Sequence, residues 1–322
     1  MKVWLAALAL VVATAGARAN ETIGINAFLG ASNLPFLVGQ HEGMFSRRGL
    51  DIALSHPKGS VDQIKGLMAG KYAVLFTAFD NVVAYHDGHG EADLGGPIDL
   101  VAFMGMDSGY LTLVAAPGTK SVAALKGKTM AVDALTTGFS FALEELLARG
   151  GVQKDAVKFL AAGSSGARWK ALQADKAQAG LLNMPLDTVA ADKGFVRLET
   201  VEGTLGHYQA GVAAVREGWA KSHAKTLRTF VAGYREAVAW LLKPEHKTEA
   251  VAILHQAVPN LDDAALGKIY ERIIDPKEGL SRDLEIDPKG AQMVLTLRQR
   301  YGSGAAHGWQ SYVDTAYLKK AR

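Results

Sequence analysis

The sequence has 322 residues, of which 49% are hydrophobic and 21% charged, with 35 basic and 32 acidic side chains and no cysteine. This balance is typical of a globular protein and is too apolar and too evenly charged for a disordered chain. The absence of cysteine excludes disulfides, thiolate metal sites, iron–sulfur clusters and cysteine nucleophiles. The length allows one large domain or two of ordinary size.

The N-terminal residues have the pattern of an export signal. A positive Lys2 precedes an apolar stretch over residues 3–15, and Ala17-Arg18-Ala19 matches the small-x-small motif that signal peptidase cuts. This stretch is too short to span a membrane. We therefore expect residues 1–19 to be a signal peptide cut after Ala19, and the mature protein to be periplasmic. The mature chain is nearly neutral and has no long basic run, so nucleic-acid binding is not expected.

Strand-like and helical patterns alternate through the first third of the mature chain. We expect strands at 22–27, 50–55, 72–77 and 99–106, separated by helices at 34–47, 61–69 and 79–86. The strands alternate apolar and polar residues or form short apolar runs, whereas the helices repeat apolar residues every three or four positions. Strands that alternate with helices predict a largely parallel sheet covered on both faces.

The same alternation begins again after residue 110. We expect strands at 111–116, 129–133, 157–161, 177–182 and 208–215, with helices at 121–125, 139–149 and 167–173. The rest is helical, at 224–242, 248–257, 262–274, 288–300 and 312–319. Because a late helical block cannot bury its faces alone, it most simply packs on the first unit. We therefore expect domain I at 20–106 and 212–322, domain II at 107–211, and a hinge of two crossings beside a cleft.

Several segments resemble one protein family. The segments PFLVGQHEGMF, RGLDI, SVAALKGKT, AVDALTTGF, RWKALQA and YVDTAYL, which begin at residues 35, 48, 121, 131, 168 and 312, are similar to motifs of the nitrate/sulfonate/taurine-binding proteins of ABC importers. That superfamily includes the thiamine-pyrimidine-synthase-like proteins, whose synthases use a cysteine-rich segment that this chain lacks. The resemblance implies an α/β, two-lobed, type II periplasmic-binding-protein fold, each lobe a mixed, mostly parallel sheet flanked by helices.

Candidate ligand-binding residues of domain I follow its first and third strands. Phe28, Ser32 and Asn33 follow the first, and Asp80 and Asn81 follow the third. Ligands of open α/β sheets bind at the carboxyl ends of strands, and the resemblance implies ligand contact for both loops. Asp80 would disfavour a purely anionic ligand and favour one with an amine or a heterocycle. The alternative is that Asp80 caps the helix that follows it.

Domain II offers a helix N-terminus after its strand 129–133. The residues there are Thr136, Thr137, Gly138, Phe139 and Ser140. Free N–H groups and hydroxyls at such an end bind carboxylate, sulfonate or phosphate without a cationic side chain. An ordinary capped helix is the alternative, because Ser and Thr are common there.

Further candidates come from the resemblance and from the crossings. The family position suggests ligand contact at Asn183 or Asp187, with a helix-start role as the alternative. Ser108, Tyr110 and Tyr208 lie on or beside the two crossings, where a side chain contacts the ligand or packs between the domains.

The sequence also contains weak signals of enzymes. Gly138-Phe139-Ser140-Phe141-Ala142 imitates a hydrolase elbow but has alanine in place of its second glycine. The loop from His86 to Asp93 contains five side chains that could ligate a metal in an exported enzyme, although a solvated connection is the more common form of such a loop. The protein could also serve as the ligand-binding partner of a sensor kinase.

We therefore expect a solute-binding protein rather than an enzyme. It would capture a small organic ligand, a sulfonate or carboxylate or one bearing an amine or heterocycle, by hinge closure. The resemblance implies an inner-membrane permease and an ATPase as partners. We expect a monomer that needs no cofactor and no metal.

Overall fold

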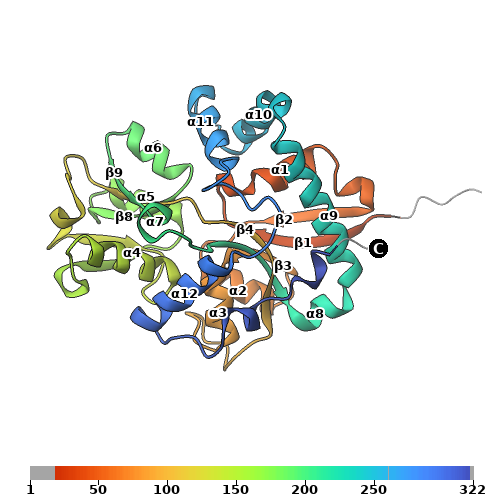
Figure 1. Ribbon diagram of the computed structural model, residues 1–322, viewed down its shortest axis with the longest axis horizontal. Helices are drawn as coiled ribbons and strands as arrows, with labels where there is room; N and C mark the ends of the chain where they lie inside the picture. The colour runs from red at the N-terminus through yellow and green to blue at the C-terminus, as the bar shows by residue number, and fades with distance from the viewer. Residues whose placement is uncertain (1–18, 260, 320–322) are drawn as a thin grey trace, which may run out of the picture.

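A computed structural model describes residues 19–259 and 261–319 (Figure 1). The expected signal peptide, apart from Ala19, lies outside these residues. The first sheet has the order β2-β1-β3-β10-β4. Its strands are β1 (Glu21–Ala27), β2 (Leu50–Ser55), β3 (Val74–Ala78), β4 (Leu100–Asp107) and β10 (Gly211–Arg216). β1 pairs in parallel with β2 and β3, and β10 is antiparallel to both β3 and β4.

The second sheet repeats this design. Its order is β7-β6-β8-β5-β9, with β5 (Leu111–Ala115), β6 (Thr129–Val132), β7 (Lys158–Ala161), β8 (Ala179–Asn183) and β9 (Val196–Thr200). β6 is parallel to β7 and β8, whereas β5 is antiparallel to β8 and β9. Both sheets are therefore mixed and mostly parallel, which confirms the predicted fold class. The chain passes between the sheets at residues 108–110 and 206–210.

Helices cover both faces of the first sheet (Figure 1). The helices encoded before β4 and after β10 are α1 (Leu34–His41), α2 (Ser60–Met68), α3 (Phe79–His86), α8 (Glu217–Ser222), α9 (Ala224–Leu241), α10 (Lys247–Ala257), α11 (Asp263–Ile273) and α12 (Pro288–Tyr301). Phe76 packs on the α1 and α9 side, whereas its neighbour Leu75 packs on the α2 and α3 side. This alternation follows from the two-residue period of a strand.

The second sheet has its own helices, and α12 connects it to the first unit. These helices are α4 (Gly138–Arg149), α5 (Ser165–Gln173), α6 (Leu186–Asp192) and α7 (Val201–Leu205). α12 packs against α4 as well as α3. As a result, one hydrophobic core contains Leu75 of β3, Leu113 of β5 and Val294 of α12. The assignment of residues 20–106 and 212–322 to domain I and 107–211 to domain II stays a prediction. The shared core is a contact between these two parts of the chain.

Several elements differ from those expected, among them two helices and the strand β9. The helix expected at 34–47 ends at His41, because Gly43 adopts a φ of 64° and the chain continues into a 3-10 turn at Ser46–Arg48. The prediction of a helix at 312–319 is wrong, because 3-10 turns occupy Trp309–Tyr312 and Thr315–Tyr317. β9 was not expected, because its alternate residues are charged and exposed. Among the described residues, none of the helices combines the length and apolar character that a membrane crossing requires.

Candidate functional site

The two lobes touch through the loops that follow their strands. Ala31, after β1, donates its N–H to the carbonyl oxygen of Met184, after β8, at 3.2 Å. The backbone N–H and the hydroxyl of Thr136 both donate to Glu91 Oε1, at 2.9 and 2.7 Å. These groups belong to different lobes, so the two lobes are in direct contact through these loops.

Asp80 makes a buried connection across this boundary. Its Oδ2 accepts the N–H of Gly138 at 2.7 Å, and its Oδ1 accepts from Arg298 of α12 at 2.8 Å. The side chains of Asp80 and Arg298 are 2% and 1% exposed. Burial raises the pKa of Asp80, while Arg298 and the Gly138 N–H act to lower it. Asp80 does not cap its own helix, because the N-cap of α3 is Ala78. It lies instead at the N-terminus of α4.

The N-terminus of α4 therefore already has protein acceptors. Thr137 is its N-cap and accepts the N–H of Ser140 at 3.4 Å, while the Thr137 hydroxyl donates to Asp133 at 2.7 Å. An anionic ligand at Gly138 would have to displace the Asp80 carboxylate. Phe139 is half-buried beside these residues. Ligand contact for this segment stays a prediction.

Asp187 connects the lobes at α6. This fully buried carboxylate accepts from Arg272 of α11 and from the Thr112 hydroxyl, both at 2.9 Å, and forms an ion pair with Arg197 of β9 at 3.1 Å. All three contacts reach the same oxygen, Oδ2. The Asp187 carboxylate therefore already has protein partners. Sequence reasoning missed Arg272, which is 85 residues away in the chain, and Arg197, which lies on the unpredicted strand β9.

A buried arginine holds the ends of β7 and β8. Arg168 donates to the carbonyls of Leu181 at 2.7 Å and Gly163 at 2.9 Å, and to the amide oxygen of Asn183 at 3.3 Å. Asn183 in turn donates to the carbonyl of Gly109 on the first crossing, at 2.9 Å. Asn183 is therefore oriented by protein groups. The sequence singled out Arg168 only as part of the family resemblance.

The remaining candidates of the first lobe lie on the same strand ends. Asn33 is buried and donates to the carbonyl of Phe28 at 2.7 Å, whereas Phe28 and Ser32 are half-buried. Asn81 donates to the Thr77 hydroxyl at 3.0 Å. Two exposed apolar side chains occupy the facing loops, with Leu29 after β1 at 74% and Leu135 after β6 at 53%. These loops therefore present both polar and apolar groups.

The crossings carry acidic and aromatic side chains. Ser108, Tyr110 and Tyr208 lie there as expected from the chain order, and both tyrosines are buried. Burial raises the pKa of Asp107 to about 6 and that of Glu202, on α7, to about 7. Sequence reasoning missed Glu202, since nothing in its local pattern distinguishes it from a surface glutamate.

The loop from His86 to Asp93 does not gather its side chains around one point. His86 bonds to the carbonyl of Leu100, Asp87 accepts from the Tyr312 hydroxyl, and Glu91 accepts from Thr136. Within residues 19–259 and 261–319, the one group that brings three such ligand atoms within 4.8 Å is His41, Glu42 and Glu249. The expectation that this loop could ligate a metal therefore has no support from its geometry.

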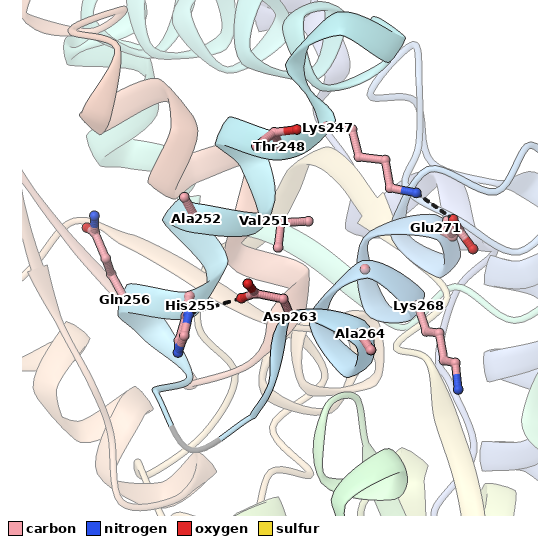
Figure 2. A pocket seen from close by; sticks show the side chains of 11 residues that line it. Lys247, Thr248, Val251, Ala252, His255, Gln256, Asp263, Ala264, Lys268 and Glu271 are labelled. Carbon is pink, nitrogen blue, oxygen red and sulfur yellow. Dashed lines mark hydrogen bonds and ion pairs between the residues drawn. The ribbon is translucent and has the colours of Figure 1, made fainter.

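Two cavities of the molecule lie away from the interlobe contacts. Figure 2 shows the larger, of about 780 Å³, between α10 and α11. Its walls carry the ion pairs Lys247–Glu271, at 2.7 Å, and His255–Asp263, at 3.4 Å. A second cavity, of about 640 Å³, lies at the start of β1 beside Asp99 and Arg216. Their acidic and basic side chains largely pair with one another, so neither cavity selects a ligand by charge.

A family model described as NMT1/THI5 like matches residues 31–247, which contain every strand of the two sheets except β1. The chain belongs to the NMT1/THI5-like family. This confirms the resemblance seen in the sequence. No curated protein sequence matches the chain.

Solved structures show the same fold. A ligand-binding component of an ABC-type import system from Staphylococcus aureus, with zinc bound, has a TM-score of 0.76 and 13% identity and covers 94% of this chain and 99% of its own. The alkanesulfonate-binding protein SsuA from Xanthomonas axonopodis pv. citri, bound to MOPS, has a TM-score of 0.70 and 14% identity, covering 94% and 98%. The periplasmic nitrate-binding protein NrtA from Synechocystis PCC 6803 has a TM-score of 0.74 and 13% identity, covering 91% and 84%.

Proposed function

We propose that the protein is the solute-binding component of an ABC importer and captures a small organic ligand between its two lobes. The observation that carries this proposal is that the family match contains all strands of both sheets except β1, and that the lobes meet at the loops after these strands. The names of the solved relatives, which are binding proteins for sulfonate and nitrate among others, support it. A permease and an ATPase would then be its partners.

The interlobe bonds suggest how capture works. The pairs Asp187–Arg272, Glu91–Thr136 and Ala31–Met184 join groups that separate when the lobes part. A ligand that contacts both lobes binds the closed form better and shifts the population toward it. The role needs no covalent step, so we propose a binding protein rather than an enzyme. A signal peptide that is removed after Ala19 would direct the protein to the periplasm. We propose that it is a monomer there.

The direct test is a ligand screen on the mature protein, residues 20–322. We expect compounds of one organic class to raise the melting temperature, because a ligand at a hundred times its Kd adds about 2.7 kcal/mol to the free energy of unfolding. Small-angle scattering should then show a smaller radius of gyration with the ligand than without it. Thermal shifts with divalent metals alone, or turnover of a bound compound, would contradict the proposal.

A further inference from the structure

Most buried acids at the interlobe boundary have an arginine partner. Asp80 pairs with Arg298, and Asp187 pairs with Arg272 and Arg197. A buried charge that is paired in this way is largely neutralised within the protein. The negative charges of Asp80 and Asp187 therefore contribute little to the attraction of a charged ligand.

Two acids at the crossings differ from these. Within the described part of the chain, no basic side chain forms an ion pair with Asp107 or Glu202. Asp107 accepts backbone N–H groups, with that of Gly109 at 2.7 Å. Glu202 has the Ser108 side chain beside it, and its Oε1 is buried without a hydrogen-bond partner. The exposed Glu278 adds another negative charge nearby. When they are ionised, the carboxylates of Asp107 and Glu202 therefore lack a basic side chain that would compensate their charge.

Each crossing also carries a buried tyrosine. The charges of Asp107 and Glu202 act on Tyr110, whereas Tyr208 is influenced first by Asp80 and also by Glu202 and Arg298. Each ring is only 4% exposed. The hydroxyl of Tyr110 is buried without a partner, and its backbone has a φ of 47°, which is uncommon for a large side chain. Strained residues of this kind cluster at ligand sites. The nearby Arg272 is engaged by Asp187.

We infer that the ligand carries a positively charged nitrogen, which Glu202 and the Tyr110 hydroxyl bind at the crossings. This inference rests on the proposed function. An ammonium or protonated ring nitrogen would donate to the unpartnered Glu202 oxygen and to the unpartnered Tyr110 hydroxyl oxygen. A metal cage does not fit, because the one three-ligand group among the described residues is His41, Glu42 and Glu249. A purely anionic ligand such as nitrate, which is named for one solved relative, would be repelled here.

Binding should also release a proton. The raised pKa of Glu202, about 7, means that this side chain is partly protonated at neutral pH. The groups that face it are Ser108, Asp107, Glu278 and the two tyrosines, none of them cationic. A cation beside Glu202 favours the carboxylate and lowers its pKa. Titration calorimetry at pH 7 in buffers of different ionisation enthalpy should therefore detect proton release into solution.

The experiment compares cationic and anionic probes on the mature protein. The cations are choline, putrescine, histamine and benzylamine, and the anions, which carry no amine, are ethanesulfonate, nitrate and benzoate. We expect at least one cation to bind, and Glu202→Gln to weaken it at least tenfold. The matched control is Glu199→Gln, an exposed glutamate of the adjoining β9 whose removal should leave the affinity within twofold. Melting curves without ligand verify that both variants fold.

The outcomes separate this inference from the proposed function. If only anions bind, or if Glu202→Gln binds the cation as tightly as the wild type, the inference is overturned while solute binding stands. If no probe of either charge binds, and native mass spectrometry of the protein purified from cells shows no co-purified solute, both fail. Cation binding that depends on Glu202 and releases a proton supports both.

Discussion

Arg298 is the residue whose role is least visible in the sequence and most specific in the structure. It lies inside α12, stacks 5.7 Å from the centroid of Phe141 and pairs with Asp80. Its neighbour Arg300 also forms an ion pair, with Glu145 of α4, but its side chain is 57% exposed. The two arginines of one helix therefore offer a comparison between a buried guanidinium and a half-exposed one, each paired with a buried carboxylate.

Replacing Arg298 by glutamine should destabilise the protein by about 3–5 kcal/mol, because Asp80 would keep a buried charge without a partner. Arg300→Gln should cost at most about 1 kcal/mol, because the Arg300 guanidinium is largely in water and Glu145 keeps Arg149 and Tyr301 as partners. Urea unfolding of both variants measures the difference. Equal losses would show that the Asp80 charge is compensated by other groups, such as the N–H of Gly138.

The position of Asp80 could be predicted from the sequence, but not its partners. It follows a buried strand, and the carboxyl end of such a strand faces the cleft of an open α/β sheet. Arg298 is 218 residues away along the chain, and no local pattern joins the two. The same holds for Asp187 and Arg272. Side-chain pairing across lobes depends on tertiary packing, which one sequence does not display.

At the scale of elements, α11 bonds to the second lobe through Arg272. Its guanidinium donates to Asp187 of α6. Asp187 keeps Arg197 and Thr112 as partners when Arg272 is removed, so its charge stays compensated. The bond between α11 and α6 should therefore matter more for closure than for folding.

Arg272→Gln should accordingly weaken ligand binding several-fold while changing the free energy of unfolding by less than about 1.5 kcal/mol. Scattering without ligand should show a larger radius of gyration than for the wild type. Lys268→Gln, an exposed position on the same helix, is the control. A large loss of stability with unchanged affinity would assign the pair to folding instead.

Elements with a clear apolar period were predictable, and those without one were not. α9 and α11 repeat buried residues every three or four positions and were expected within a residue or two of their bounds. β9 alternates half-buried residues with exposed Arg197 and Glu199 at the edge of its sheet, so its apolar signal is weak. The turns at 309–317 follow from local bonds, such as the Asp314 side chain accepting the N–H of Ala316.

At the scale of the whole molecule, uncompensated acids couple stability to pH. Burial raises the pKa of Glu202 from an ordinary 4.5 to about 7. The folded form therefore holds this proton more tightly than the unfolded chain does. The contribution of this protonation to the free energy of unfolding is fully present below about pH 4.5 and is lost as the pH rises through about 7.

Without ligand, Glu202→Gln should thus gain stability relative to the wild type between pH 5 and pH 8. The gain should be up to about 3 kcal/mol, which is the free energy equivalent of this pKa change. Urea unfolding at the two pH values measures it, and Glu199→Gln should show no such dependence. A pH-independent difference between Glu202→Gln and the wild type would mean that Glu202 titrates normally.

The place of β10 in the first sheet has a consequence for export. β10 lies between β3 and β4, and β4 pairs with no other strand of its sheet. A chain that emerges from a translocation channel with its N-terminus first would therefore release β4 more than a hundred residues before its pairing partner. Meanwhile the second sheet, encoded by residues 111–200 without interruption, can assemble completely. The interrupted unit would thus present an unpaired apolar strand during secretion, the kind of edge that aggregates or recruits chaperones.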